Sequence, residues 1–272
     1  GLLEPLSRSL GQTILIDTRV GADGIIAANT CAKAAPTGHT LCSTGNSMIA
    51  LNPVTRVKLS YDPIRDFTPV VFTGFFDSML LVHPSVEARS VTQLVDLARA
   101  KPGTLSWGHF GLNTTGNFYQ EYFKKNRNAP FYPVPYKTTG QTLQALIGGE
   151  VQVAVYGWAS AQGVIRSGKL RPLAVTAAKR IAPFPDVPTF TEAGIQLPLR
   201  GWFGYHVPAG TPRAVVRRWN AEIRKIMADP GYRKSYLDKL GIDVGDGTPE
   251  EFDRFIRSQL KEMAALIKGL GV

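Results

Sequence analysis

The chain has 272 residues, of which 44% are hydrophobic and 19% are charged, a composition typical of globular rather than disordered proteins. The length suits two domains, and no apolar run approaches the roughly 20 residues that a membrane-spanning helix needs. The net charge of +10 is spread along the chain and accompanies no recognised nucleic-acid-binding motif, so we predict no nucleic-acid partner.

The first hundred residues alternate helical and strand-like patterns in the spacing of their apolar residues. Helices are predicted over 1–10, 24–35 and 91–100, and a short one opens at Asn46. Strands are predicted over 13–17, 39–43, 67–73 and 79–82, the last two separated by Gly74. Ser90 is placed to cap the helix at 91–100, and Pro102 follows the end of that helix.

The same alternation continues after Pro102 and then gives way to helices. Strands are predicted over 104–107, 132–134, 151–155 and 170–176, and helices over 118–125, 141–148 and 161–167. Three C-terminal helices follow over 212–228, 231–240 and 249–266, the last opened by a capping box at Thr248. Alternating strands and helices are typical of parallel sheets covered by helices. We therefore predict two α/β domains, 1–101 with 202–272 and 102–201.

The chain has two cysteines, Cys31 and Cys42, one in a predicted helix and one in a predicted strand. We expect buried free thiols rather than a disulfide, because a free cysteine behaves as a small core residue. Two cysteines without a CxxC pair, and four dispersed histidines, predict no metal site.

Several segments recur in a recognisable order along the chain. PDVPT at 185–189 is followed by EAG at 192–194, and GKLRPLAVT precedes both at 168–176. Other segments are AAPTGHTL at 34–41, YDP at 61–63, WFG at 202–204 and PAGTP at 208–212. Together they resemble the tripartite tricarboxylate transporter receptor family, also called Bug proteins, over the whole chain.

The resemblance implies an α/β fold of the periplasmic-binding-protein type, a type II-like Venus flytrap with a cleft between two α/β lobes. It implies a monomer in the periplasm that binds a small carboxylate and delivers it to the permease subunits of a membrane transporter. It also implies that the protein has no catalytic residues and needs no cofactor.

The sequence departs from the family pattern at three places. Family members normally begin with a strand and a Gly-rich loop that grips the carboxylate; this sequence starts after both, and we expect it to begin inside a longer protein. Tyr156 stands where many members have an Asp able to pair with an amino group, so an amino-acid ligand is disfavoured. Asn117 stands where a His is common.

Loops that follow strands and open helices present free N–H groups and the positive end of the helix dipole, which favour anions. Taken singly, each loop is equally explained by turn and capping chemistry. With the resemblance, we predict ligand contacts from Ser43, Thr44, Asn46, Ser47, Gly111, Asn113, Thr114, Thr115, Tyr136, Thr138 and Thr139. Phe76, Tyr156 with Gly157, and Trp202 complete the predicted site. About half of the aromatic residues near the predicted cleft are expected in the core; stacking by the others favours an aromatic carboxylate, with an aliphatic dicarboxylate second.

Two other classes of function were weighed. An acyl-transfer enzyme is suggested by SQLK at 258–261, which matches SxxK, and by KTTG at 137–140, but Ser258 lies on a polar predicted helix and no SDN motif accompanies it. A ligand-binding partner of a membrane sensor kinase would use the same clamp as a transport receptor, and the sequence does not separate the two.

Overall fold

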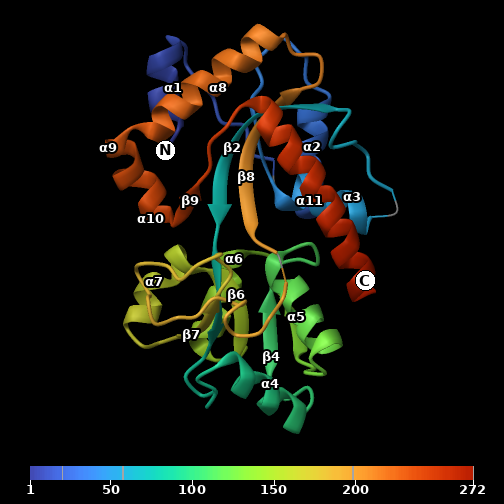
Figure 1. Cartoon of the computed structure of the whole chain (residues 1–272), viewed down its shortest axis with the longest axis vertical. Helices are drawn as coiled ribbons and strands as arrows, with labels where there is room; N and C mark the ends of the chain where they lie inside the picture. The colour runs from blue at the N-terminus through green and yellow to red at the C-terminus, as the bar shows by residue number, and fades with distance from the viewer. Residues whose placement is uncertain (20, 57, 198, 272) are drawn as a thin grey trace. The chain divides into compact units, whose positions relative to one another are not determined.

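The computed structural model describes residues 1–19, 21–56, 58–197 and 199–271 (Figure 1). The chain divides into two compact units: unit 1 comprises Gly1–Phe75 with Trp202–Val272, and unit 2 comprises Phe76–Gly201. The predicted division instead assigned 76–101 to the first domain. Those residues contain a strand and a helix that belong to unit 2, because the strand pairs with two strands of the unit 2 sheet.

Unit 1 is built on a four-stranded sheet in the order β1-β8-β2-β9. Its strands are β1 (Cys42–Gly45), β8 (Gly201–Pro208), β2 (Phe67–Phe76) and β9 (Ile242–Val244). β1 and β8 are antiparallel, with Cys42 opposite His206 and Gly45 opposite Phe203. The prediction of parallel sheets is therefore wrong for this pair.

Helices cover the unit 1 sheet, as Figure 1 shows for α8 and α11. The described helical elements are α1 (Leu3–Leu10), α2 (Ile25–Ala32), a π-helical turn (Ser47–Leu51) continuing into α3 (Asn52–Thr55), α8 (Arg213–Ala228), α9 (Pro230–Tyr232), α10 (Asp238–Leu240) and α11 (Pro249–Leu270). The capping box of α11 is confirmed, because Thr248 Oγ1 accepts a hydrogen bond from the Glu251 N–H and Glu251 returns one to the Thr248 N–H.

Unit 2 is built on a five-stranded sheet in the order β5-β4-β6-β3-β7. Its strands are β3 (Ser78–Val82), β4 (Ser106–His109), β5 (Tyr132–Pro135), β6 (Val153–Gly157) and β7 (Arg171–Val175). β4 runs parallel to β5 and β6, but β3 runs antiparallel to β6 and β7, so the sheet is mixed. Every residue of β3 and β6 is buried, which explains their continuous apolar sequences.

The unit 2 helices are α4 (Val91–Ala100), α5 (Thr115–Asn126), α6 (Thr139–Gly148) and α7 (Trp158–Arg166). The bounds of α4 coincide with the prediction, and Ser90 Oγ accepts a hydrogen bond from the Gln93 N–H as an N-cap. The other three helices begin two or three residues before their predicted starts.

Two strand predictions in unit 1 are wrong. Residues 13–17 form an extended segment outside the described sheet, with Leu15 86% and Ile16 68% exposed. Their alternation is typical of a strand, but a strand also needs a neighbour, and none pairs with this segment in the described part of the chain. Gly74 does not end β2. It lies inside that strand at φ +142°, where an added Cβ would stand 2.4 Å from the Asp243 carbonyl oxygen.

A disulfide joins Cys31 on α2 to Cys42 at the start of β1. The prediction of free thiols is therefore wrong. The two Cα atoms lie 6.1 Å apart, within the range of natural disulfides, because the fold places the end of α2 beside β1. Neither cysteine sits in a local motif, so only the fold reveals the pairing.

Removing this disulfide should destabilise unit 1. A covalent link across about 11 residues restricts the unfolded chain by about 2–3 kcal/mol. We expect Cys31→Ser/Cys42→Ser to lower the free energy of unfolding by that amount in denaturant titrations. Dithiothreitol should lower the midpoint of the natural protein towards that of the double variant and leave the variant unchanged. Equal stability of both proteins without reductant would show that the link contributes nothing.

Candidate functional site

The predicted ligand residues differ in how accessible they are. Ser43, Thr138 and Thr139 are exposed, and Ser47, Phe76, Gly111, Thr115 and Tyr136 are half-buried. Buried are Thr44, Asn46, Asn113, Thr114, Tyr156, Gly157 and Trp202. Ser43–Ser47 and Trp202 belong to unit 1, and the remaining predicted residues belong to unit 2.

In unit 1, β1 runs directly into a helical turn at Asn46, so a short loop connects strand and helix as predicted. The Thr44 side chain is turned inward, with Oγ1 2.7 Å from His206 Nδ1 and 3.1 Å from the Gly204 carbonyl oxygen. Asn46 is also buried, and its Oδ1 has no hydrogen-bond partner among the described residues. Thr44 thus fixes β1 to β8, whereas Asn46 retains an acceptor.

Trp202 lies in the core of unit 1 rather than at a surface. Its side chain is 1% exposed, and its ring packs at 5.4–5.8 Å from those of Phe252 and Phe255 on α11. Tyr156 and Trp158 are likewise buried, in the hydrophobic core of unit 2. Of the eight aromatic residues expected near the cleft, these three and Trp107 are buried, in line with the expectation for about half.

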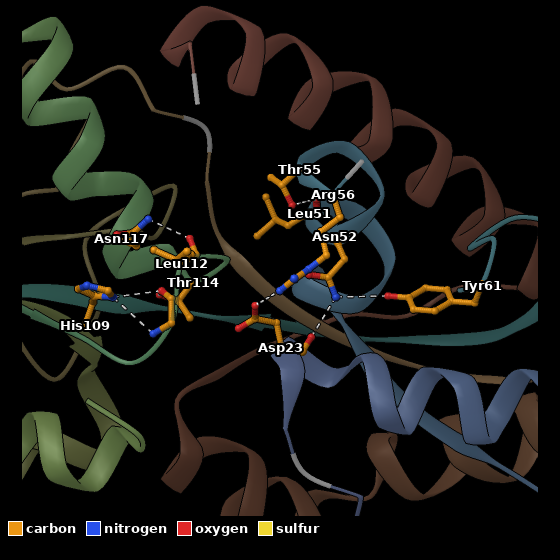
Figure 2. Close-up of polar contacts among 11 residues, drawn as sticks. Asp23, Leu51, Asn52, Thr55, Arg56, Tyr61, His109, Leu112, Thr114 and Asn117 are labelled. Carbon is orange, nitrogen blue, oxygen red and sulfur yellow. Dashed lines mark hydrogen bonds and ion pairs between the residues drawn. The ribbon is translucent and has the colours of Figure 1, made fainter. Parts of the chain in front are cut away.

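A second polar network in unit 1 was not predicted (Figure 2). The fully buried Asn52 donates through Nδ2 to the Asp23 carbonyl oxygen (3.0 Å) and to the Tyr61 hydroxyl (3.3 Å). That hydroxyl donates to the Met48 carbonyl oxygen at 2.6 Å, and burial raises the pKa of Tyr61, which keeps the donor protonated. Arg56 pairs with the Asp23 carboxylate. The network fastens the turn before α2 to the helix that follows β1.

In unit 2, the loop between β4 and α5 is held by its own side chains (Figure 2). Thr114 Oγ1 donates to the Gly111 carbonyl oxygen at 2.8 Å, and Asn117 Nδ2 donates to the Leu112 carbonyl oxygen at 2.9 Å. His109 Nδ1 lies 3.4 Å from the Gly111 nitrogen, and burial lowers the pKa of this ring. Because its hydroxyl is turned towards Gly111, Thr114 does not cap α5 with its side chain.

The start of α6 is different. Thr138 Oγ1 accepts from the Gln141 N–H at 3.2 Å, and Gln141 Oε1 accepts from the Lys137 N–H at 3.1 Å. Beside this turn lies an open hollow of about 760 Å³, lined in part by Tyr136, Lys137 and Glu150. Capping chemistry therefore explains Thr138, while the hollow leaves room for a ligand beside Tyr136.

Phe76 lies on the start of α7. Gly157 precedes the first residue of that helix, and a Cβ added there would stand 2.3 Å from Phe76 Cζ. Only a glycine lets the ring approach the backbone this closely. Phe76 and Gly157, singled out separately in the sequence, are thus in contact.

Phe76 is followed by a buried ion pair that sequence reasoning missed. The Asp77 side chain is 3% exposed and binds Arg200 through two hydrogen bonds of 2.8 and 2.9 Å. Thr176 Oγ1 donates to Asp77 Oδ1 at 3.1 Å and accepts from the Ser78 N–H at 2.9 Å. Asp77 and Arg200 lie 123 positions apart, so no local pattern signals the pair.

Breaking this pair from one side should be costly. Arg200→Met leaves the Asp77 carboxylate buried without its counter-ion, and we expect a loss of about 3–5 kcal/mol in the free energy of unfolding. The matched control is Arg180→Met, which removes an exposed partner of Glu192 and should change stability little. Equal, small losses in both variants would show that Asp77 does not depend on Arg200.

His206 makes the stability of unit 1 depend on pH. Burial lowers its pKa from 6.5 to about 3, so the unfolded chain binds more protons than the folded one between these values. The free energy of unfolding should therefore fall as the pH falls from 6.5 towards 3, by up to about 1.4 kcal/mol per pH unit from this residue. Denaturant titrations between pH 7.5 and 4.5 should show a flatter slope for His206→Gln.

Thr44→Val is the control for this measurement, because it removes the neighbour of His206 Nδ1 but leaves the ring buried. The variant should keep the slope of the natural protein. An unchanged slope in His206→Gln would assign the acid sensitivity to other groups.

The described residues contain no group of three metal-ligating side chains and no helix long and apolar enough to cross a membrane. Ser258, the serine of the SxxK match, is exposed on α11 and donates to Glu262 Oε1 at 2.8 Å.

Two sheets, each covered by helices, define the mixed α/β fold of periplasmic binding proteins, and solved structures of that class match it. The model of the tripartite tricarboxylate transporter family receptor matches residues 2–272, and the chain belongs to this family.

Among relatives, the UPF0065 protein in the tcbD–tcbE intergenic region of Pseudomonas sp. (strain P51) is 33% identical over 96% of this chain and 78% of its own. Among solved structures, Rpa4515 of R. palustris with adipate is 31% identical, with a TM-score of 0.91 over 99% of this chain and 90% of its own. MatC (Rpa3494) from Rhodopseudomonas palustris with bound malate is 26% identical, with a TM-score of 0.87 over 98% and 92%.

Proposed function

We propose that the chain is an extracytoplasmic receptor that captures a small carboxylate and delivers it to the permease subunits of a tripartite tricarboxylate-type transporter. The observation that carries this proposal is the loop before α5, where Thr114 shapes the backbone and leaves the helix N-terminus without a side-chain cap. Family membership supplies the transport role. No catalytic step is proposed.

The carboxylate is bound mainly by main-chain N–H groups. The uncapped first turn of α5 favours an anion by about 0.3–1 kcal/mol at an exposed position, and more where water is excluded. Gly111, Thr115 and the loop beside Tyr136 supply contacts from unit 2, and Ser43, Asn46 and Ser47 supply contacts from unit 1. Asn46 Oδ1, which lacks a partner among the described residues, suits a ligand hydroxyl or a water that bridges to the ligand.

The ligand we favour is an aliphatic dicarboxylate, with an aromatic carboxylate second. Two of the aromatic residues expected to stack on a flat ligand, Tyr156 and Trp202, are buried in the cores of their units. Adipate accompanies a relative 31% identical to this chain, and malate one that is 26% identical. Both are aliphatic dicarboxylates, which reverses the order suggested by the aromatic content of the sequence.

A periplasmic location agrees with the Cys31–Cys42 disulfide. Disulfides form and persist in the bacterial periplasm and are rare in reducing compartments. A monomer is proposed as the transporting form.

A thermal-shift panel on the protein tests this function. At about a hundred times its dissociation constant, a ligand that binds only the folded state stabilises it by about 2.7 kcal/mol. We expect adipate and malate to raise the melting temperature, benzoate to act less, and aspartate and glucose to have no effect. Stabilisation by glucose and not by any carboxylate would refute the carboxylate receptor. Isothermal titration with ligand-stripped protein excludes a ligand retained from expression.

A further inference from the structure

Two exposed apolar side chains lie on the loops proposed to bind the carboxylate. Leu112, 69% exposed, sits between Gly111 and Asn113 before α5 in unit 2. Phe203, 44% exposed, lies on β8 opposite Gly45 in unit 1. A large exposed apolar side chain is informative when its surroundings explain why it is held outward.

Leu112 is held outward by a loop that buries its polar neighbours. Asn113 and Thr114 are at most 9% exposed, whereas the leucine between them and Gly111 faces solvent. The Leu112 carbonyl oxygen accepts from Asn117 Nδ2, and Thr114 Oγ1 holds the Gly111 carbonyl oxygen (Figure 2). The loop thus inverts the usual arrangement, in which polar side chains face water and apolar ones are buried.

Unit 1 repeats this inversion beside its own loop. Thr44 and Asn46 are buried, whereas Phe203 on the neighbouring strand is exposed. The Phe203 ring lies over Gly45, because a Cβ added there would stand 3.3 Å from Phe203 Cδ1 and 2.9 Å from the Trp202 carbonyl oxygen. A residue larger than glycine at position 45 would therefore press on the strand and the ring.

From these contacts we propose that Leu112 and Phe203 bind the nonpolar body of the carboxylate and make the receptor prefer ligands with an unbranched apolar body over short hydroxylated ones. This inference rests on the proposed function, and it names the chemical class of substrate. Main-chain N–H groups recognise a carboxylate and carry no information on the rest of the ligand. The apolar side chains beside them select that part through the area that they remove from water.

Titration calorimetry with adipate and malate on the full protein tests the inference. Adipate has four methylene groups between its carboxylates, and malate has a shorter, hydroxylated body. We expect the natural protein to bind adipate more tightly than malate. Leu112→Ser and Phe203→Ser should each weaken adipate binding by about tenfold and change malate binding by less than about threefold. Leu112→Met should retain adipate affinity, because it keeps the apolar contact.

Leu240→Ser is the matched control, since Leu240 is 53% exposed on α10, away from both loops. It should leave both affinities unchanged, and a melting curve for each variant verifies folding. Adipate affinities within about twofold of the natural protein in both serine variants would overturn the inference, as would equal losses for both acids or a natural preference for malate. Binding of neither acid by the natural protein would instead refute the proposed function itself.

Discussion

The buried carboxylate of Asp77 is the constraint on which unit 2 depends most directly. A charge at 3% exposure is tolerated only with a counter-ion and further hydrogen bonds, and Arg200 and Thr176 supply them. These contacts fix the start of β3 against the end of β7 and hold Phe76, the preceding residue. The Asp77 carbonyl oxygen also accepts from the Trp158 N–H at the start of α7. One residue thus places both the sheet and the aromatic ring on Gly157.

The proposed binding loops use their polar side chains to shape the backbone. Thr114 donates to Gly111 and Thr44 contacts His206, so neither hydroxyl points to solvent. The start of α6 follows the more usual arrangement, in which Thr138 caps the helix. The comparison explains why the sequence alone did not rank these loops: the same residue type, threonine, caps one helix and leaves another N-terminus available to an anion.

Unit 1 is held by different interactions. The Cys31–Cys42 disulfide ties α2 to β1, and neutral His206 contacts Thr44 from within the aromatic core formed with Phe67 and Phe252. Both features bear on β1, the strand that leads into the loop at 43–47. Oxidation of the thiols and neutrality of the ring are therefore conditions for a correctly placed loop in this unit.

The sequence by itself determined the features that depend on neighbouring residues. The caps at Ser90 and Thr248, the helix at 91–100 and the buried strands at β3 and β6 follow from local chemistry, and ordered short motifs identified the family. Only the tertiary structure decided what depends on distant partners. The segment at 13–17 has a strand-like pattern without a paired strand, β3 is antiparallel to β6, Cys31 meets Cys42, and Asp77 meets Arg200. Trp202 was likewise placed in the core by α11, because burial depends on which elements pack together and not on the residue type alone.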